Sequence, residues 1–199
     1  MGTRIDTSCF RRGVSNEDVL NTTVNEVELT IYALVANLDQ VEGACVERKR
    51  MEQWDIPVDS DQGRMRIRKV DDLQWQLTSK TYRPGLIGAM ECTTTIVKAQ
   101  YDNIKRLAVN GHYKTRLVIP FVSHPYKWEV DVYYTRGGGP SRWVKIDLEG
   151  FDINKEIPEE LPFDCEEIIL SDDPNLPEAK RRQIEELWKD EWLKISREP

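Results

Sequence analysis

The chain has few of the residues from which zinc sites and disulfide frameworks are built. Its 199 residues include four cysteines and two histidines. The cysteines form no C-x-x-C pair, so we expect free thiols in a reducing compartment. His112 and His124 are too few and too scattered for a histidine-based metal centre. These absences argue against a disulfide scaffold and against a zinc protein of the usual kinds.

Long apolar runs are also missing. No run approaches the ~20 residues that a membrane-spanning helix needs. The N-terminus, Met1-Gly2-Thr3-Arg4, shows no apolar segment of the kind found in secretory signals. We therefore expect a cytoplasmic protein without a membrane partner. The net charge is −7, whereas nucleic-acid-binding domains usually carry a basic surplus, so no DNA partner is expected. Nothing in the sequence indicates an oligomeric state.

The chain does contain a repeated alternation of charged and apolar residues. Residues i and i+2 of a strand share a face, so an alternating segment presents one charged and one apolar face. Two arrangements suit such strands: a sandwich with its charged faces in solvent, or a sheet closed around a charged interior with helices outside. We favour the second, because several segments carry a single sign of charge. The alternating segments are 26–31, 64–68, 114–117, 128–132 and 144–148.

Turn signals between these segments predict about eight antiparallel strands. Helical spacing predicts helices over 97–110 and 177–195, and the acidic, proline-containing segment 151–174 is expected to be irregular. The predicted fold class is α+β: an antiparallel eight-stranded closed tunnel barrel with a charged interior, helices packed outside and a C-terminal helix. Residues 1–23 would form a tail and short helix, 24–150 the tunnel domain, and 151–199 an acidic segment and a helix packing on the barrel.

The charged segments, taken in order over residues 25–150, resemble the motifs of the CYTH or triphosphate tunnel metalloenzyme family. That family includes class IV adenylyl cyclase, thiamine triphosphatase and inorganic triphosphatase. A competing match at Glu47-Arg48-Lys49 to the first motif is rejected, because only 14 residues would then separate Lys49 from Arg64. The matching segments are Glu26–Thr30 (E-x-E-x-K), Arg64–Arg68 (R-L-R-x-R), Leu77–Lys80 (L-T-x-K), Glu91 (R-x-E-x-E), Lys114–Arg116 (K-x-R), Trp128–Val132 (W-E-I-D-x-F) and Lys145–Leu148 (E-x-E-L).

The resemblance implies a Mg²⁺- or Mn²⁺-dependent hydrolase of a triphosphate-bearing small molecule. Basic side chains would hold the phosphates by charge-assisted bonds, and carboxylates would hold the metal ion. The implied catalytic residues are Glu26, Glu28, Lys80 and Arg116. The implied substrate-binding residues are Arg64, Arg66, Arg68, Lys80, Lys114, Arg116 and Lys145. The implied metal-binding residues are Glu26, Glu28, Glu91, Glu129, Asp131 and Asp147.

Several positions depart from the family pattern. Thr30 stands where the first motif has lysine. Lys145 and Asp147 stand where the last motif has its first and second glutamates. Ala89 and Thr93 replace the arginine and second glutamate of the R-x-E-x-E motif. Two alternatives therefore stay open beside a hydrolase: a non-catalytic protein that binds a nucleotide or polyphosphate, and an adenylyl cyclase. The motifs do not choose between inorganic triphosphate, a nucleoside triphosphate, thiamine triphosphate and an RNA 5′ end.

Overall fold

The computed structural model describes residues 29–59, 63–82, 90–121, 126–134, 138–149 and 160–170. These residues form nine strands and two helices. In chain order they are β1 (Leu29–Val35), α1 (Leu38–Ala44), β2 (Glu47–Ile56), β3 (Gly63–Val70), β4 (Gln74–Thr81), β5 (Met90–Ile96), α2 (Lys98–Lys105), β6 (Asn110–Pro120), β7 (Lys127–Tyr134), β8 (Pro140–Glu149) and β9 (Cys165–Leu170).

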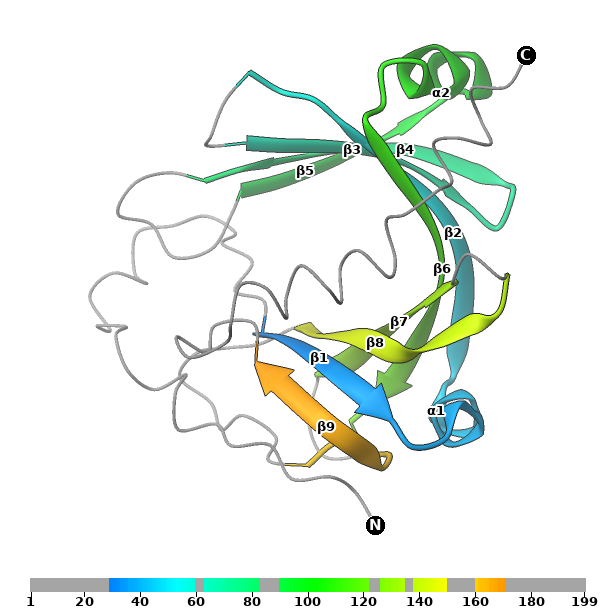
Figure 1. Cartoon of the computed structure of the whole chain (residues 1–199). Helices are drawn as coiled ribbons and strands as arrows, with labels where there is room; N and C mark the ends of the chain where they lie inside the picture. Colours follow the sequence, from blue (N-terminus) through cyan, green and yellow to red (C-terminus); the bar gives the residue numbers. More distant parts are fainter. Residues whose placement is uncertain are drawn as a thin grey trace.

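All nine strands belong to one antiparallel sheet, in the order β5-β4-β3-β2-β6-β7-β8-β1-β9. Figure 1 shows this sheet bent into a C, with β2 and β6 at its back and both helices on its convex side. The predicted α+β class with antiparallel strands is confirmed. Within the described ranges β5 and β9 are the two edges and no hydrogen-bonded ladder joins them, so a closed eight-stranded barrel is not what this part shows.

The ninth strand lies in a segment that the sequence predicted to be irregular. β9 pairs with β1, and its Ile168 and Leu170 pack against the apolar cluster on the convex face. The acidic residues around it hide this short apolar pattern, because a six-residue edge strand needs only two or three inward side chains. The helix predicted over 97–110 is also shorter than expected: α2 ends at Lys105, and Asn110 already begins β6.

The apolar half of each alternating strand faces the convex side and packs there. On the convex side of β1, β6, β7 and β8, the core includes the fully buried Ile31, Leu117 and Ile146, together with Val41 of α1. Burying each such side chain contributes about 1.5–3 kcal/mol. The predicted placement of apolar side chains against outer helices is therefore present in this part of the chain.

A second core lies under α2, and local hydrogen bonds begin both helices. Trp54, Ile67 and Tyr101 pack together where α2 contacts β2, β3 and β4. At the start of α1, the Asn37 side chain accepts a hydrogen bond from the Asp39 amide, a usual N-cap arrangement. These two helix-covered cores hold the convex side, so the concave side is left for the charged side chains.

The structure bears only partly on the other predictions from sequence. No helix in the described ranges is long and apolar enough to span a bilayer. The expected strand start at Glu26 and Glu28 and the helix expected over 177–195 lie outside the described residues. The predicted division into 1–23, 24–150 and 151–199 remains a prediction.

Candidate functional site

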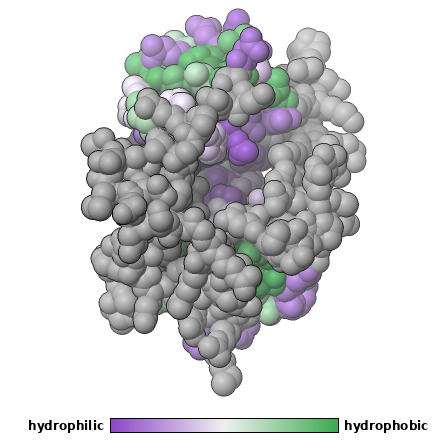
Figure 2. Space-filling model, turned by 90° about the vertical axis from the view of Figure 1, so that its left-hand side faces the viewer, coloured by the Kyte–Doolittle hydropathy of each residue, from purple (hydrophilic) through white to green (hydrophobic). Residues whose placement is uncertain are grey.

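Strand register brings the predicted charged residues together on the concave face. Residues that pair across neighbouring strands share a face. Arg64, Lys80 and Glu91 are successive partners on β3, β4 and β5, and Arg116 pairs with Asp131. Figure 2 looks onto the open side of the C and shows hydrophilic side chains inside a hollow. The predicted residues on this face are Arg64, Arg66, Arg68, Lys80, Glu91, Lys114, Arg116, Glu129, Asp131, Lys145 and Asp147.

The centre of this face is a buried ion network on β6 and β7. Asp131 is 0% exposed, yet it accepts from Lys114 Nζ at 2.5 Å and from Arg116 Nε at 2.7 Å. Arg116 also bonds Glu129. Burial by itself would raise the pKa of Asp131, but Arg116 and Lys114 hold that pKa well below its usual range. The carboxylate is therefore ionised and fixes the direction of two basic side chains.

Lys114 is the most deeply buried base of the network. Only 4% of its surface is exposed. Burial, together with the nearby charges of Arg116 and Arg68, lowers the pKa of Lys114 to about 7, although Asp131 pulls in the opposite direction. A lysine with this pKa gains and loses its charge near neutral pH. The charge of Lys114 therefore depends on the charged groups that surround it.

A second ion cluster lies on β3, β4 and β5. Glu91 Oε2 is 2.9 Å from Lys80 Nζ and 3.2 Å from an Arg66 terminal nitrogen. Thr93, which stands where the family motif has a glutamate, donates to Glu91 at 3.2 Å. Burial alone would raise the pKa of Glu91, but Lys80 and Arg66 lower it. One carboxylate therefore serves two bases here.

Arg66 has a buried donor that nothing among the described residues satisfies. Its Nε is shielded from solvent and has no hydrogen-bond partner within those residues. By contrast, Nε of neighbouring Arg68 donates to Gln53 Oε1 at 2.9 Å. Orphaned buried donors are rare in folded proteins, and each calls for an explanation. An anion on the concave face would supply the missing acceptor.

A third cluster joins β8 and β1. Lys145 Nζ contacts both oxygens of Asp147, at 2.7 and 2.5 Å. The Thr30 hydroxyl donates to the same carboxylate at 2.7 Å. Burial alone would raise the pKa of Asp147, but Lys145 lowers it. Two of the positions that depart from the family motifs, Thr30 and Lys145, thus meet at one aspartate.

The described carboxylates have the hard oxygen atoms that Mg²⁺ and Mn²⁺ prefer, but basic partners already hold them. Among the described residues no group of three or more histidine, cysteine, aspartate or glutamate side chains is disposed to hold a metal ion. The predicted ligands Glu26 and Glu28 lie outside the described part of the chain.

Sequence reasoning missed the residues that β2 contributes to this face. Lys49 pairs with Arg116, and Gln53, only 6% exposed, pairs with Arg68. The signal that could have found them is the period of two along β2. The odd-numbered residues Lys49, Met51 and Gln53 lie on the same side of that strand. Because those side chains differ in chemical type, the strand shows no simple charge alternation in the sequence.

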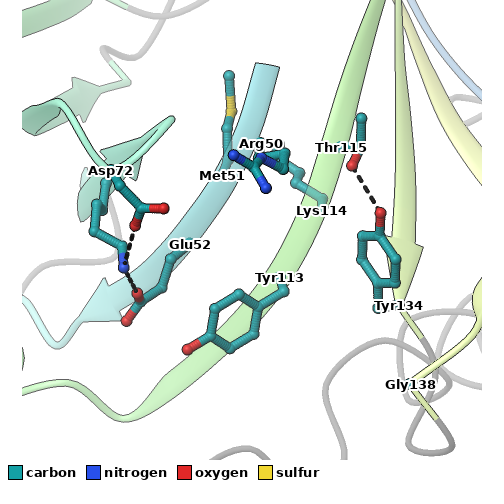
Figure 3. Close-up of a pocket in the computed structure, with 10 residues that line it drawn as sticks. Arg50, Met51, Glu52, Asp72, Tyr113, Lys114, Thr115, Tyr134 and Gly138 are labelled. Carbon is teal, nitrogen blue, oxygen red and sulfur yellow. Dashed lines mark hydrogen bonds and ion pairs between the residues drawn. The ribbon is translucent and has the colours of Figure 1, made fainter. Parts of the chain in front are cut away.

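A cavity of about 300 Å³ near the middle of the sheet (Figure 3) is lined mainly by residues of the convex face, and Met51 and Lys114 of the concave face also contribute to its lining. Its charged groups largely neutralise one another: Lys69 Nζ lies 3.0 Å from Glu52 and 2.8 Å from Asp72. The hydroxyl groups of Thr115 and Tyr134 are bonded to each other at 2.9 Å. On the concave face, seven predicted bases face four predicted carboxylates among the described residues, so that face is the better candidate for an anion site. The cavity is lined by Arg50, Met51, Glu52, Lys69, Asp72, Tyr113, Lys114, Thr115, Tyr134 and Gly138.

Comparison with known proteins found similar solved structures. No family model and no curated protein matches the sequence. The chain is similar to a solved structure described as the inorganic triphosphatase NE1496, with 16% identity, a TM-score of 0.47, and coverage of 77% of this chain and 91% of that one. It is also similar to a protein from Bacillus halodurans suggested to be an adenylate cyclase, with 14% identity, a TM-score of 0.44, and coverage of 65% and 82%.

Proposed function

We propose that the protein binds a triphosphate-bearing small molecule on its concave face and hydrolyses it with the help of a divalent metal ion. The observation that carries this proposal is the surplus of bases over carboxylates among the predicted residues of the concave face, including the buried Nε of Arg66 that lacks a described acceptor. The ligand class is inorganic triphosphate, a nucleoside triphosphate or thiamine triphosphate. Charge-assisted bonds to phosphate are about twice as strong as neutral hydrogen bonds, so such a face favours a polyanion.

Basic residues lie on two strands of the concave face, and this arrangement suits a ligand with several linked phosphates. Arg66 and Arg68 lie on β3, whereas Lys114 and Arg116 lie on β6, and β2 separates the two strands. A phosphate bound at Arg66 would replace Glu91 as the partner of the Arg66 guanidinium. It would also accept a hydrogen bond from Arg66 Nε. Lys80 and Arg116 would stabilise charge that develops on the transferred phosphoryl group. Arg64 and Lys145 would extend the basic lining at either side.

Burial supports the proposal that these side chains line a tunnel, not an open sheet face. Asp131 is 0% and Lys114 is 4% exposed although both lie on the charged face. A solvated sheet face would leave such side chains accessible. We therefore propose the closed barrel of the sequence prediction as the form in which the ligand is held.

Mg²⁺ or Mn²⁺ is proposed as the cofactor, with Glu26 and Glu28 as its main ligands. When bound, the metal would neutralise phosphate charge and activate a water molecule for in-line attack. The described residues would bind and orient the phosphates and exclude bulk water.

A non-catalytic binding protein is the second candidate, and the cluster around Asp147 favours it. Thr30 offers a hydroxyl where the family motif has a lysine, so one fixed positive charge is missing from β1. The bases would still hold a polyphosphate in its ground state. Stabilisation of the transition state, which needs charge placed at the reacting phosphoryl group, would suffer more.

Two assays on one sample of the full chain test both candidates. Phosphate release is measured with a triphosphate panel in Mg²⁺ or Mn²⁺, with and without chelator, and binding is measured by calorimetry. Release that a chelator abolishes supports the hydrolase, whereas micromolar binding without release supports the binder. Cyclic AMP formation from ATP would instead indicate the cyclase. If the panel shows neither binding nor turnover, both candidates are wrong.

Single substitutions locate the site. Arg66→Ala and Arg116→Ala should each weaken triphosphate binding by about tenfold or more, because each removes charge-assisted bonds worth about 1.5–3 kcal/mol. Lys98→Ala is the control: Lys98 is exposed and pairs with Asp102 on α2. Equal small losses at all three positions would indicate nonspecific charge attraction instead of this site.

A further inference from the structure

Lys145 lies within a patch of carboxylates on two neighbouring strands. Its cross-strand partner on β7 is Asp131, and the partner of Asp147 on β7 is Glu129. Three carboxylates thus share one small area of the concave face. Carboxylates placed this closely repel one another unless a cation lies between them. In many proteins that cation is a divalent metal ion.

In this chain the cation is a side chain. The Lys145 ammonium contacts both oxygens of Asp147, at 2.7 and 2.5 Å, and Thr30 supplies a hydrogen bond at 2.7 Å. Asp147 is only 4% exposed, so these contacts replace most of its hydration. The other two carboxylates have their own basic partners: Arg116 contacts both, and Lys127 lies 3.0 Å from Glu129.

In this arrangement a basic side chain contacts every carboxylate of the patch. The Lys145 ammonium contacts both oxygens of Asp147, so a metal ion would have to compete with that ammonium for the carboxylate. The finding that no described group of acidic residues is disposed to hold a metal agrees with this geometry. A positive charge also remains at the patch in the absence of any ion from solution.

We propose that the Lys145 ammonium is a tethered cation that takes the place of a divalent metal ion beside Asp147. Replacing Lys145 with a neutral residue therefore creates a metal site at this end of the concave face. This proposal rests on the proposed function and deepens it. The positive charge beside Asp147 comes from the Lys145 side chain and not from a bound ion, and Glu26 and Glu28 remain the proposed metal ligands. Its test uses metal alone, so it stands or falls separately from hydrolysis.

The experiment compares Mn²⁺ binding to the wild-type chain and to Lys145→Gln by calorimetry, up to about 1 mM Mn²⁺. We expect the variant to bind one more Mn²⁺ per chain than the wild type. Lys145→Arg keeps the charge and should bind as the wild type does. Lys98→Gln is the matched control, because it frees Asp102 from a comparable but exposed lysine pair and should create no site.

A double variant, Lys145→Gln with Asp147→Asn, identifies the ligand. It should lose the additional ion, because the carboxylate that would bind it is gone. The proposal is overturned if Lys145→Gln binds Mn²⁺ as the wild type does, or if the additional ion persists in the double variant. If Lys145→Gln is unfolded without metal, refolding by Mn²⁺ supports the proposal. Failure to refold at about 1 mM overturns it, because a divalent ion then cannot replace the ammonium.

Discussion

Replacing Asp131 by asparagine should strongly destabilise the fold, although the two side chains have nearly the same shape. Asp131 is 0% exposed and accepts from Lys114 Nζ at 2.5 Å and from Arg116 at 2.7 and 2.9 Å. Removing one partner of a buried ion pair costs about 3–5 kcal/mol, because it leaves the opposite charge uncompensated. Asparagine keeps one acceptor oxygen, so the lower end of that range, about 3 kcal/mol, is expected.

Thermal and urea unfolding of the full chain measure this loss. For a protein of this size, 3 kcal/mol corresponds to a fall in Tm of roughly 6–12 °C. Asp102→Asn is the matched control: its carboxylate pairs with Lys98 at 2.5 Å on the surface. Exposed pairs contribute little, so that variant should lie within about 0.5 kcal/mol of the wild type.

Added tripolyphosphate connects this prediction to the site. In Asp131→Asn, Lys114 and Arg116 lack their carboxylate, so a bound polyanion should raise the Tm of the variant more than that of the wild type. If Asp131→Asn is as stable as Asp102→Asn, the ion network does not carry the stability argued for it. If tripolyphosphate stabilises neither protein, the anion site is elsewhere.

Three further predictions concern charge, metal and packing. The pKa of Lys114 is lowered to about 7, so this lysine is charged below that pH. Triphosphate should therefore bind more tightly as the pH falls through 7. In calorimetric titrations, Lys114→Arg should reduce this pH dependence. Glu28→Gln should abolish metal-dependent phosphate release while circular dichroism remains unchanged, and normal turnover would place the metal elsewhere. Gly111→Ala should lower the free energy of unfolding, measured in urea, by about 1–3 kcal/mol, because the added Cβ would lie 2.3 Å from the Trp54 ring. Gly43→Ala on α1 is the control: its Cβ would meet nothing within 4 Å, so this variant should be as stable as the wild type or slightly more stable.

The sequence alone was enough to predict which side chains share a face. Period-two alternation is a local property of each strand, so Arg64, Arg66 and Arg68 had to lie together wherever β3 was placed. The order of the charged segments then indicated an antiparallel sheet with apolar faces turned outward, and the register confirms this for the described strands. The sequence also predicted a turn at Asp71 and Asp72, between β3 and β4. Both residues adopt positive φ in the structure, as such a turn requires.

Only the tertiary structure decided which charges meet. Lys145 and Asp147 are two residues apart on one strand, and the sequence cannot tell whether such a lysine turns to its neighbour or leaves the carboxylate to a metal. The answer depends on Thr30, 117 positions away in the chain, and on the strands that bury Asp147. β9 is a similar case, because its few apolar residues form a strand only where the edge of β1 accepts them. Local periodicity determines the faces, whereas long-range packing determines the partners.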